Sequence, residues 1–71
     1  MVADRLKELR KAHRATQKTV AAAIGTTERQ YQDYEYGKNK PGCDILIALA
    51  DFFNVSIDYL VGRTDKQEVN R

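Results

Sequence analysis

Residues 17–35, which read QKTVAAAIGTTERQYQDYE, decide the fold of this chain. Val20, Ala21 and Ile24 recur at helical spacing, so the first part of the stretch is predicted to be a helix. Gly25 follows the last apolar position of this pattern. A glycine there ends a helix, because it adopts a positive φ without strain. The stretch is therefore expected to open with a helix that stops at residue 25.

A second helix is predicted to begin directly after this turn. Thr27 offers a capping hydroxyl and Gln30 lies three residues later, which is the spacing of a capping box. Tyr31 and Tyr34 are the expected inward positions. Two amphipathic helices joined by a short glycine-containing turn form a helix-turn-helix, although such neighbours are common in any helical domain. A polar outer face lets such a helix enter the major groove; here that face consists of Glu28, Arg29, Gln32 and Asp33.

The longer stretch 17–41 resembles the helix-turn-helix of the Cro and phage-repressor family. The likeness rests on residues in both helices and in the loop that follows them: Gln17, Ala21, Gly25, Tyr34, Glu35, Gly37, Lys38 and Pro41. Residues 46–65, LIALADFFNVSIDYLVGRTD, are also typical of that family. The resemblance implies an all-α, compact five-helix lambda-repressor-like domain with the helix-turn-helix at its second and third helices. It also implies DNA binding, without indicating which DNA.

Length and charge agree with one small domain that has an anionic partner. We expect residues 1–65 to form the DNA-binding domain and residues 66–71 to be a flexible tail. Residues 1–40 carry nine Lys/Arg and five Asp/Glu, a balance of +4, whereas residues 41–71 carry three and five, a balance of −2. A basic half suits nucleic acid, although basic residues on helical surfaces can also be simply solvated.

No signature of catalysis, metal binding or a membrane is found. The chain has one cysteine, Cys43, and one histidine, His13. It therefore cannot form an internal disulfide, and it lacks a four-ligand zinc set and a catalytic triad. We expect no enzyme activity, no catalytic residue, no metal, no cofactor and no small-molecule ligand. Without a signal peptide or a membrane-spanning run, a reduced, cytoplasmic location follows. Cys43 is expected to be buried and His13 to be exposed.

Three further helices are expected around the central pair. The first should run from about residue 3 to 13 with Ala12 on its inward stripe, and the fourth from about 43 to 53. A last short helix, 57–61, should follow a Ser56 cap, and the chain should fray from Arg63 onward. The inward side chains are predicted to be Leu6, Leu9, Val20, Ala21, Ile24, Tyr31, Leu46, Leu49, Phe53, Val55 and Leu60.

The resemblance also assigns structural roles near the first helix. In the family, the positions of Arg10 and Glu35 form an ion pair, and both residue types match here. We interpret them as a structural ion pair that ties the first helix to the end of the recognition helix. Arg14 and Ala15 depart from the family, which usually has Gly or Asn and then Leu at these positions. We therefore expect a less stable connection between the first helix and the second at these two residues.

Base reading is assigned to the outer face of the second helix of the motif. Arg29 is the best candidate because a guanidinium binds guanine O6 and N7 as a fork; Gln32 could bind adenine and Glu28 could accept from cytosine N4. Arg29 and Asp33 stand at i, i+4, so a pair between them would either aim the fork or be a plain surface ion pair. The base-reading set is Thr27, Glu28, Arg29, Gln32 and Asp33.

Phosphate contacts are assigned to the loop 36–42, YGKNKPG, and to the start of the motif. In the resembling proteins this loop lies along the phosphate backbone, and the residue at position 17 reaches a phosphate and braces the recognition helix. Lys38, Lys40 and free backbone N–H groups would supply salt-dependent affinity; elsewhere, two loop lysines would mean only solubility. The phosphate-contacting set is Thr16, Gln17, Tyr36, Lys38, Asn39 and Lys40.

A second subunit is expected because the helix 43–53 is apolar almost all round, more than a small core covers. Resembling proteins dimerise around the last helix. The predicted interface is Ile45, Phe52, Ile57 and Tyr59, and the homodimer should be weak without DNA. The alternative is that Phe52 merely folds onto the loops or the C-terminal tail.

These observations predict a sequence-specific transcriptional regulator of bacterial or phage origin. It would bind double-stranded operator DNA as a dimer, with its third helix in the major groove, and repress transcription. The alternative is a helix-turn-helix scaffold for protein–protein contact, such as an antitoxin-like or anti-repressor partner. The acidic residues on the recognition face favour this alternative, whereas Gln17, Lys38 and Lys40 favour DNA.

Overall fold

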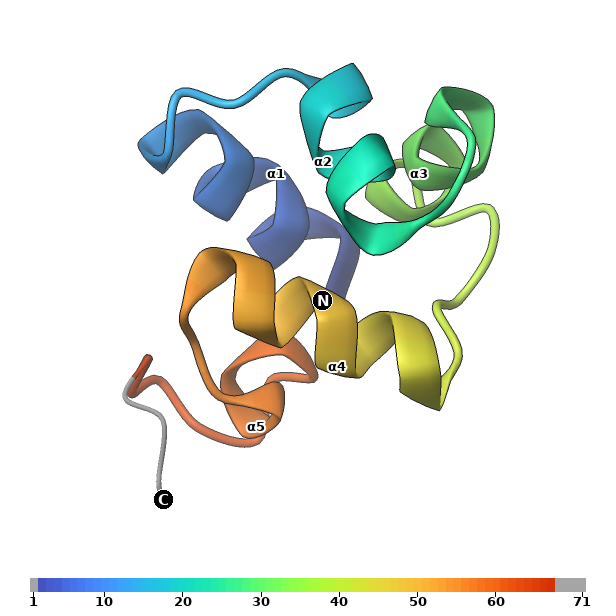
Figure 1. Ribbon diagram of the computed structural model, residues 1–71. Helices are drawn as coiled ribbons and strands as arrows, with labels where there is room; N and C mark the ends of the chain where they lie inside the picture. Colours follow the sequence, from blue (N-terminus) through green and yellow to red (C-terminus); the bar gives the residue numbers. More distant parts are fainter. Residues whose placement is uncertain (1, 68–71) are drawn as a thin grey trace.

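The computed structural model describes residues 2–67 and contains five helices and no strand within that range (Figure 1). The predicted all-α architecture is confirmed, with α2 and α3 forming the helix-turn-helix. The helices are α1 (Val2–Ala12), α2 (Gln17–Ile24), α3 (Glu28–Glu35), α4 (Cys43–Phe53) and α5 (Ile57–Leu60).

Side-chain caps and left-handed residues define most helix boundaries. The hydroxyls of Thr16, Thr27 and Ser56 each accept a hydrogen bond from the backbone N–H three residues later, at 3.1, 3.1 and 3.0 Å. Each bond satisfies an amide that has no partner inside the helix. α2 is followed by Gly25, with φ of 78°, and α4 is followed by Asn54, with φ of 55°, both in the left-handed region.

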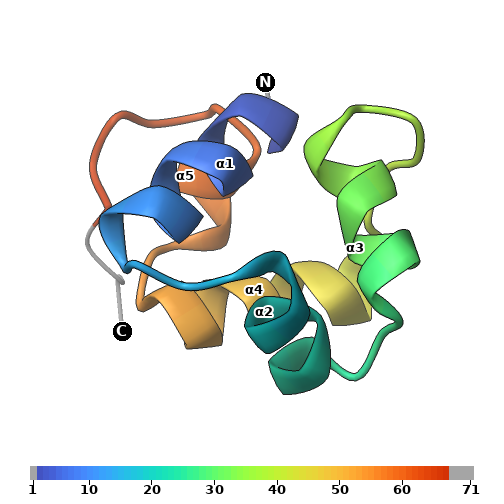
Figure 2. The same cartoon turned by 90° about the horizontal axis from the view of Figure 1, so that it is seen from above.

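One hydrophobic core joins the five helices. α1 packs against α3 and α5, and α2 packs against α3 and α4, as Figure 2 shows from above. Every member of the expected inward set is buried except Leu46, which is only partly buried. The largest fully buried side chains are Tyr31, Phe53, Leu6, Leu49, Leu60 and Val20.

Three other expectations about burial were wrong. Cys43 is exposed because it is the first residue of α4, ahead of the turns that reach the core. Ala12 is exposed at the last position of α1. Tyr59, expected on a dimer surface, is only 9% exposed, and its ring centroid lies 4.1 Å from the Arg5 guanidinium carbon.

The segment after α5 is held against the domain by Arg5. Its guanidinium donates hydrogen bonds of 2.7 and 2.8 Å to the backbone oxygens of Tyr59 and Thr64. It also pairs with the Asp65 carboxylate at 2.9 Å. These contacts link α1 to residues more than fifty positions away in sequence.

The fraying expected from Arg63 does not describe residues 63–67. The backbone oxygen of Gln67 accepts a 3.0 Å hydrogen bond from the Ser56 N–H, so the chain folds back on the start of α5. Residues 68–71 of the predicted tail lie outside the described residues.

Two further properties concern the range 2–67. None of its helices is long and apolar enough to cross a membrane. It also contains no group of three or more His, Cys, Asp or Glu side chains arranged to hold a metal ion.

Candidate nucleic-acid interface

α3 lies beside α2 and leads into the loop before α4 (Figure 1), and its side chains outside the core are polar. Glu28 and Arg29 are exposed at the start of this helix, whereas Gln32 and Asp33 are half-buried. The hydroxyl of Thr27 accepts a hydrogen bond from the backbone N–H of Gln30, so this group already acts as the cap of α3. The exposed charged groups of the expected base-reading set are therefore confined to the first turn of α3.

Arg29 and Asp33 do not form the pair that the i, i+4 spacing allowed. The ion pairs within residues 2–67 are Arg5–Asp65 and Arg10–Glu35. Asp33 contributes through its backbone instead, since its carbonyl oxygen accepts from the N–H groups of two loop residues. The Arg29 guanidinium is thus exposed without a carboxylate aiming it, and the interpretation of an aimed fork has no support in this structure.

A buried ion pair fixes α3 to α1. Arg10 Nε lies 2.6 Å from Glu35 Oε2, and Arg10 Nη2 donates a second hydrogen bond of 3.3 Å to Oε1. Glu35 is 3% exposed. Removing one partner from such a pair leaves a buried charge without compensation, which costs about 3–5 kcal/mol. The pair therefore holds the end of α3 in one position.

Glu35 stays ionised although it is buried. Burial by itself raises the pKa of this carboxyl, but hydrogen bonds, first among them that of Arg10, outweigh burial and hold the pKa below its ordinary value. The same hydrogen bond raises the pKa of Arg10. Both groups are therefore charged at neutral pH.

Gln17, at the first position of α2, extends the hydrogen bonding of the Arg10–Glu35 pair toward the surface. Its Nε2 donates to Glu35 Oε1 at 3.3 Å, and its Oε1 accepts from Gln32 Nε2 at 3.1 Å. The residue thus braces α3, as the family resemblance implied. Gln32, expected to be a free base reader, has part of its hydrogen-bonding capacity engaged by Gln17.

The loop between α3 and α4 folds back on the end of α3. The N–H groups of Lys38 and Asn39 donate to the Asp33 carbonyl oxygen at 2.9 and 3.3 Å. Gly37, with φ of 75°, makes this reversal possible. The expectation that these two N–H groups are free was wrong, because they close the turn. The side chains of Tyr36, Lys38, Asn39 and Lys40 are exposed.

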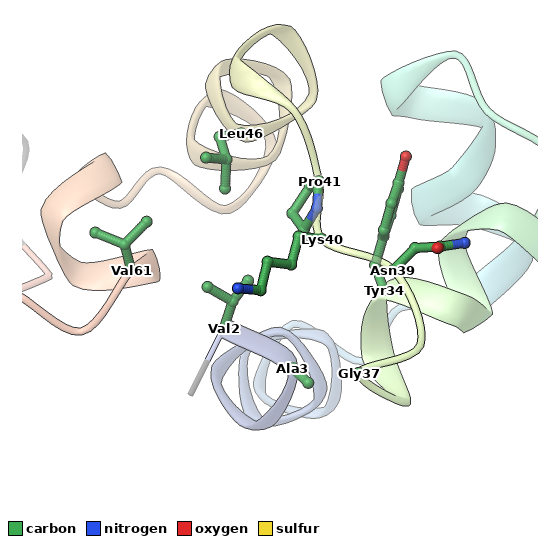
Figure 3. A pocket seen from close by; sticks show the side chains of 9 residues that line it. All are labelled: Val2, Ala3, Tyr34, Gly37, Asn39, Lys40, Pro41, Leu46 and Val61. Carbon is green, nitrogen blue, oxygen red and sulfur yellow. The ribbon is translucent and has the colours of Figure 1, made fainter.

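Lys40 crosses a groove between the loop and the N-terminal end of α1 (Figure 3). Its stem runs over the opening toward Val2, a typical use of an aliphatic lysine stem over apolar surface. The groove has a volume of about 410 Å³ and explains why Leu46 is not fully buried. Its lining consists of Val2, Ala3, Tyr34, Gly37, Asn39, Lys40, Pro41, Leu46 and Val61.

The contacts bring the predicted base-reading set and the predicted phosphate-contacting set together. Gln17 reaches Gln32 and Glu35, and the backbone of Lys38 reaches Asp33, so the start of α2, the outer face of α3 and the loop adjoin. In the expected dimer group, Ile57 is 39% exposed, Ile45 and Phe52 are partly buried, and Tyr59 is buried.

Sequence reasoning missed the hydrogen bond between Gln17 and Gln32 and the clamp made by Arg5. The two glutamines are fifteen positions apart, and Arg5 and its partners more than fifty. No local spacing signals either contact. It also missed the surface of Ile47, which is 45% exposed on α4.

The fold and the braced polar helix define a helix-turn-helix domain of the Cro and phage-repressor type. Residues 6–60 match the helix-turn-helix family HTH_3, and the chain belongs to that family. The resemblance inferred from the sequence is thereby confirmed.

Named regulators are among the similar proteins. The chain is 43% identical, over 92% of its length, to the uncharacterized HTH-type transcriptional regulator YobD of Bacillus subtilis, 58% of which is covered. It is 38% identical, over 94% of its length, to the cryptic phage CTXphi transcriptional repressor RstR of Vibrio cholerae, 62% of which is covered. The chain spans about three-fifths of the length of these curated relatives.

Solved structures share the fold. A transcriptional regulator from Listeria innocua superposes with a TM-score of 0.84 at 35% identity, covering 100% of this chain and 64% of that one. The P22 c2 repressor protein, crystallised in complex with synthetic operator 9T, superposes with a TM-score of 0.81 at 23% identity. That match covers 84% of this chain and 91% of the repressor chain, and it shows the fold alone.

Proposed function

We propose that this chain is a DNA-binding transcriptional regulator that represses transcription by placing α3 in the major groove of an operator. The observation that carries the proposal is that side-chain contacts hold α3 against two other helices. Its exposed first turn projects from a helix held to α1 by the buried Arg10–Glu35 pair and to α2 by Gln17. Similarity to proteins named as transcriptional regulators and as a phage repressor supports it.

In this proposal the first turn of α3 reads bases. The exposed Arg29 guanidinium can donate two parallel hydrogen bonds to guanine O6 and N7, and exposed Glu28 can accept from cytosine N4. Thr27, Gln32 and Asp33 complete the proposed reading face. Because the helix is fixed by a buried ion pair, these side chains start from a defined backbone position.

Affinity that is independent of sequence would come from the surface around α3. Exposed Lys38 and Lys40 are the charged groups of the adjoining loop, and each phosphate that a lysine neutralises releases counterions. Thr16, Gln17, Tyr36 and Asn39 are the uncharged members of the proposed phosphate-contacting surface. Lys40 has to swing away from the groove that it crosses in Figure 3 to take part.

The proposed binding unit is a weak homodimer. Two recognition helices reach successive major grooves only when a twofold dimer spaces them by about 34–36 Å. Ile57, 39% exposed, is the centre of the proposed interface, with the partly buried Ile45 and Phe52 beside it. Tyr59 is no longer included, because it is buried under Arg5.

A second candidate is a protein-interaction module on the same scaffold. The observation that favours it concerns two acidic side chains of α3. Within residues 2–67, the Glu28 and Asp33 carboxylates have no cationic partner in an ion pair. Unpaired carboxylates near phosphates cost affinity for DNA. A basic protein surface would be an alternative partner for them.

Selection of duplexes from a random pool, followed by titration at low and moderate salt, tests the proposal. Arg29→Ala should weaken binding to the selected duplex by about 1–3 kcal/mol and relax the preference at one base pair. Lys38→Ala should weaken binding to all duplexes alike and flatten the log–log salt slope by roughly one unit.

Lys66→Ala is the matched control. Lys66 is also exposed, and the segment after α5 lies on the opposite side of the domain from α3 (Figure 1). This variant should bind like the wild type. If no duplex is enriched, or if Arg29→Ala and Lys66→Ala bind equally well, α3 is not a DNA-reading helix. That outcome would favour the protein-interaction module instead.

A further inference from the structure

The groove that Lys40 crosses has aliphatic walls from four separate segments of the chain. Val2 lies in the first turn of α1 and Leu46 on α4. Pro41 lies in the loop and Val61 directly after α5, and all four residues are half-buried. The volume of about 410 Å³ falls within the range of about 300–1,000 Å³ that is usual for small-molecule sites. The groove is therefore large enough to hold a small organic molecule.

The backbone of the loop closes one end of this groove. Gly37, with φ of 75°, reverses the chain after α3, and a Cβ built on it would lie 3.9 Å from the Cβ of Ala3. The loop thus meets α1 at this point, and the groove lies between this contact and α4 (Figure 3). Pro41 has no N–H, so its part of the wall offers no backbone donor.

The groove also has an electrostatic character. Among the described residues that line it, Lys40 is the charged one and none is acidic. The Lys40 ammonium takes part in neither of the ion pairs found within residues 2–67. In Figure 3 its Nζ atom lies near Val2, whereas the polar ends of Tyr34 and Asn39 point away from Lys40. A cation without a carboxylate partner thus lies over an apolar hollow.

This combination selects one chemical class of ligand. A lysine stem over a filled apolar surface is ordinary, but here the surface beneath the stem is hollow. An aliphatic chain would cover the walls, and a carboxylate at its end would pair with the ammonium. Such a pair is stronger beside apolar walls than in open water, because the local dielectric constant is lower. A neutral apolar molecule leaves the ammonium unpaired, and a small anion leaves the walls in water.

We propose that the groove binds a small aliphatic carboxylate, which covers Val2, Leu46 and Val61 and pairs with Lys40. The regulatory consequence rests on the proposed function, in which Lys40 leaves the groove to contact a phosphate. A bound carboxylate holds the ammonium in the groove, so it weakens DNA binding, and DNA weakens carboxylate binding by the same factor. The sequence predicted no small-molecule ligand, because the walls of this site come from segments far apart in the chain.

Titration of the free chain with octanoate tests the site without DNA. The methyl signals of Val2, Leu46 and Val61 in nuclear magnetic resonance spectra should move and saturate, whereas those of Ile24, which does not line the groove, should stay. Octan-1-ol has an aliphatic chain without the charge, and acetate has the charge without the chain. Both should bind more weakly than octanoate. Groove signals that stay in place, or that move equally with octan-1-ol, overturn the proposal.

Three variants separate the charge from the hollow. Lys40→Ala should weaken octanoate binding by about three- to tenfold, through the lost ion pair. Lys38→Ala is the matched control, since Lys38 is an exposed lysine of the same loop that does not line the groove. Ala3→Leu fills the groove from a helical position that accepts leucine and should abolish octanoate binding while the helical circular dichroism persists. Equal octanoate affinity in wild type and Lys40→Ala overturns the role of Lys40, and undiminished affinity in a folded Ala3→Leu overturns the site.

The regulatory consequence is tested on a duplex selected from a random pool, with equal acetate as the ionic control. Saturating octanoate should flatten the log–log salt slope of the wild type by roughly one unit. It should leave the slopes of Lys40→Ala and Ala3→Leu unchanged, whereas Lys38→Ala should keep the response. An unchanged wild-type slope overturns the coupling to DNA. If the wild type enriches no duplex, the proposed function fails instead, and the two failures are distinguishable because the methyl titration needs no DNA.

Discussion

At the scale of single residues, Tyr31 places a hydroxyl in the core without a hydrogen-bond partner. The side chain is 0% exposed, and its oxygen makes no well-formed hydrogen bond to another described group, although the Glu35 carboxylate lies near enough for a weak contact with it that helps to lower the pKa of that carboxyl. Burial is the main reason why the pKa of this hydroxyl lies far above its ordinary value, with the neighbouring Glu35 adding to it. An unsatisfied buried hydroxyl costs about 1–3 kcal/mol.

Tyr31→Phe should therefore keep or raise stability at neutral pH, by up to about 1 kcal/mol, because it removes that oxygen and little volume. It should also change the response to alkaline pH. The unfolded tyrosine loses its proton above about pH 10, whereas the folded one keeps it, so stability falls as pH rises through that range. Urea unfolding at pH 7 and pH 10.5 checks both effects. A clear loss of stability at pH 7 would show that the hydroxyl is bonded.

Arg14, two residues beyond the end of α1, lies in the left-handed region, with φ of 55°. The sequence predicted a weak joint here, because the family usually has Gly or Asn at this position. A residue with a Cβ pays about 1–2 kcal/mol in this conformation, and glycine does not.

Arg14→Gly should stabilise the domain by about 0.5–1 kcal/mol, after the added freedom of the unfolded chain is subtracted. Thermal unfolding with both proteins at equal concentration measures the difference. Lys11→Gly, in the last turn of α1, is the control and should instead destabilise by about 1 kcal/mol. Destabilisation by both substitutions would refute the left-handed assignment of Arg14.

At the scale of elements, α4 begins differently from the helices that carry side-chain caps. α2, α3 and α5 each start with a hydroxyl that accepts a backbone N–H. The residue that precedes α4 is Gly42, which has the same extended conformation, with ψ of 177°, but no side-chain cap. A Cβ built on Gly42 meets no atom within 4 Å. The helix that lies across the core thus starts without a cap that its geometry permits.

Gly42→Ser should stabilise the domain by about 0.5–1 kcal/mol, through a new cap and a less flexible unfolded chain. Denaturant unfolding with an unchanged slope is the measurement. Gly25→Ser provides the contrast, because Gly25 has a φ of 78° and a serine there is strained. If both substitutions destabilise, the conformation assigned to Gly42 is wrong.

At the scale of the whole molecule, Arg5 and the folded-back segment after α5 decide which apolar groups remain accessible. They cover Tyr59 and leave Ile57 at 39% exposed. The proposed dimer surface therefore loses Tyr59 and keeps Ile57, the first residue of α5. Ile47, 45% exposed on α4, is the other large aliphatic group in solvent within residues 2–67.

Ile57→Asp should abolish cooperative binding to duplexes with two inverted half-sites, because a charge in an apolar contact is costly. Binding to a single half-site and the helical circular dichroism should persist. Ile47→Asp is the comparison, since it places the same charge at an equally exposed isoleucine of α4. Sedimentation that shows unchanged self-association in Ile57→Asp, or an equal loss in Ile47→Asp, would contradict an interface at α5.

Helix positions were predictable because their causes are local. Thr27 and Ser56 cap the helices that they were expected to cap, and Gly25 follows the end of α2 as expected. A hydroxyl and an amide three residues apart, or a glycine after an apolar stripe, act within one turn of chain. The Arg10–Glu35 contact was reached only through the family resemblance, since the two residues lie twenty-five positions apart.

Hydrogen-bond partners and the exposure of individual side chains were decided by tertiary packing. Gln32 has the same side chain whether it is free or held by Gln17, and Tyr59 looks like interface surface until Arg5 covers it. Leu46 has the period of a core residue, yet the groove beside it has no neighbouring element to fill it. Periodicity indicates which face of a helix is apolar. Which neighbour meets that face depends on how distant segments come together, because burial and hydrogen-bond satisfaction are properties of the assembled domain.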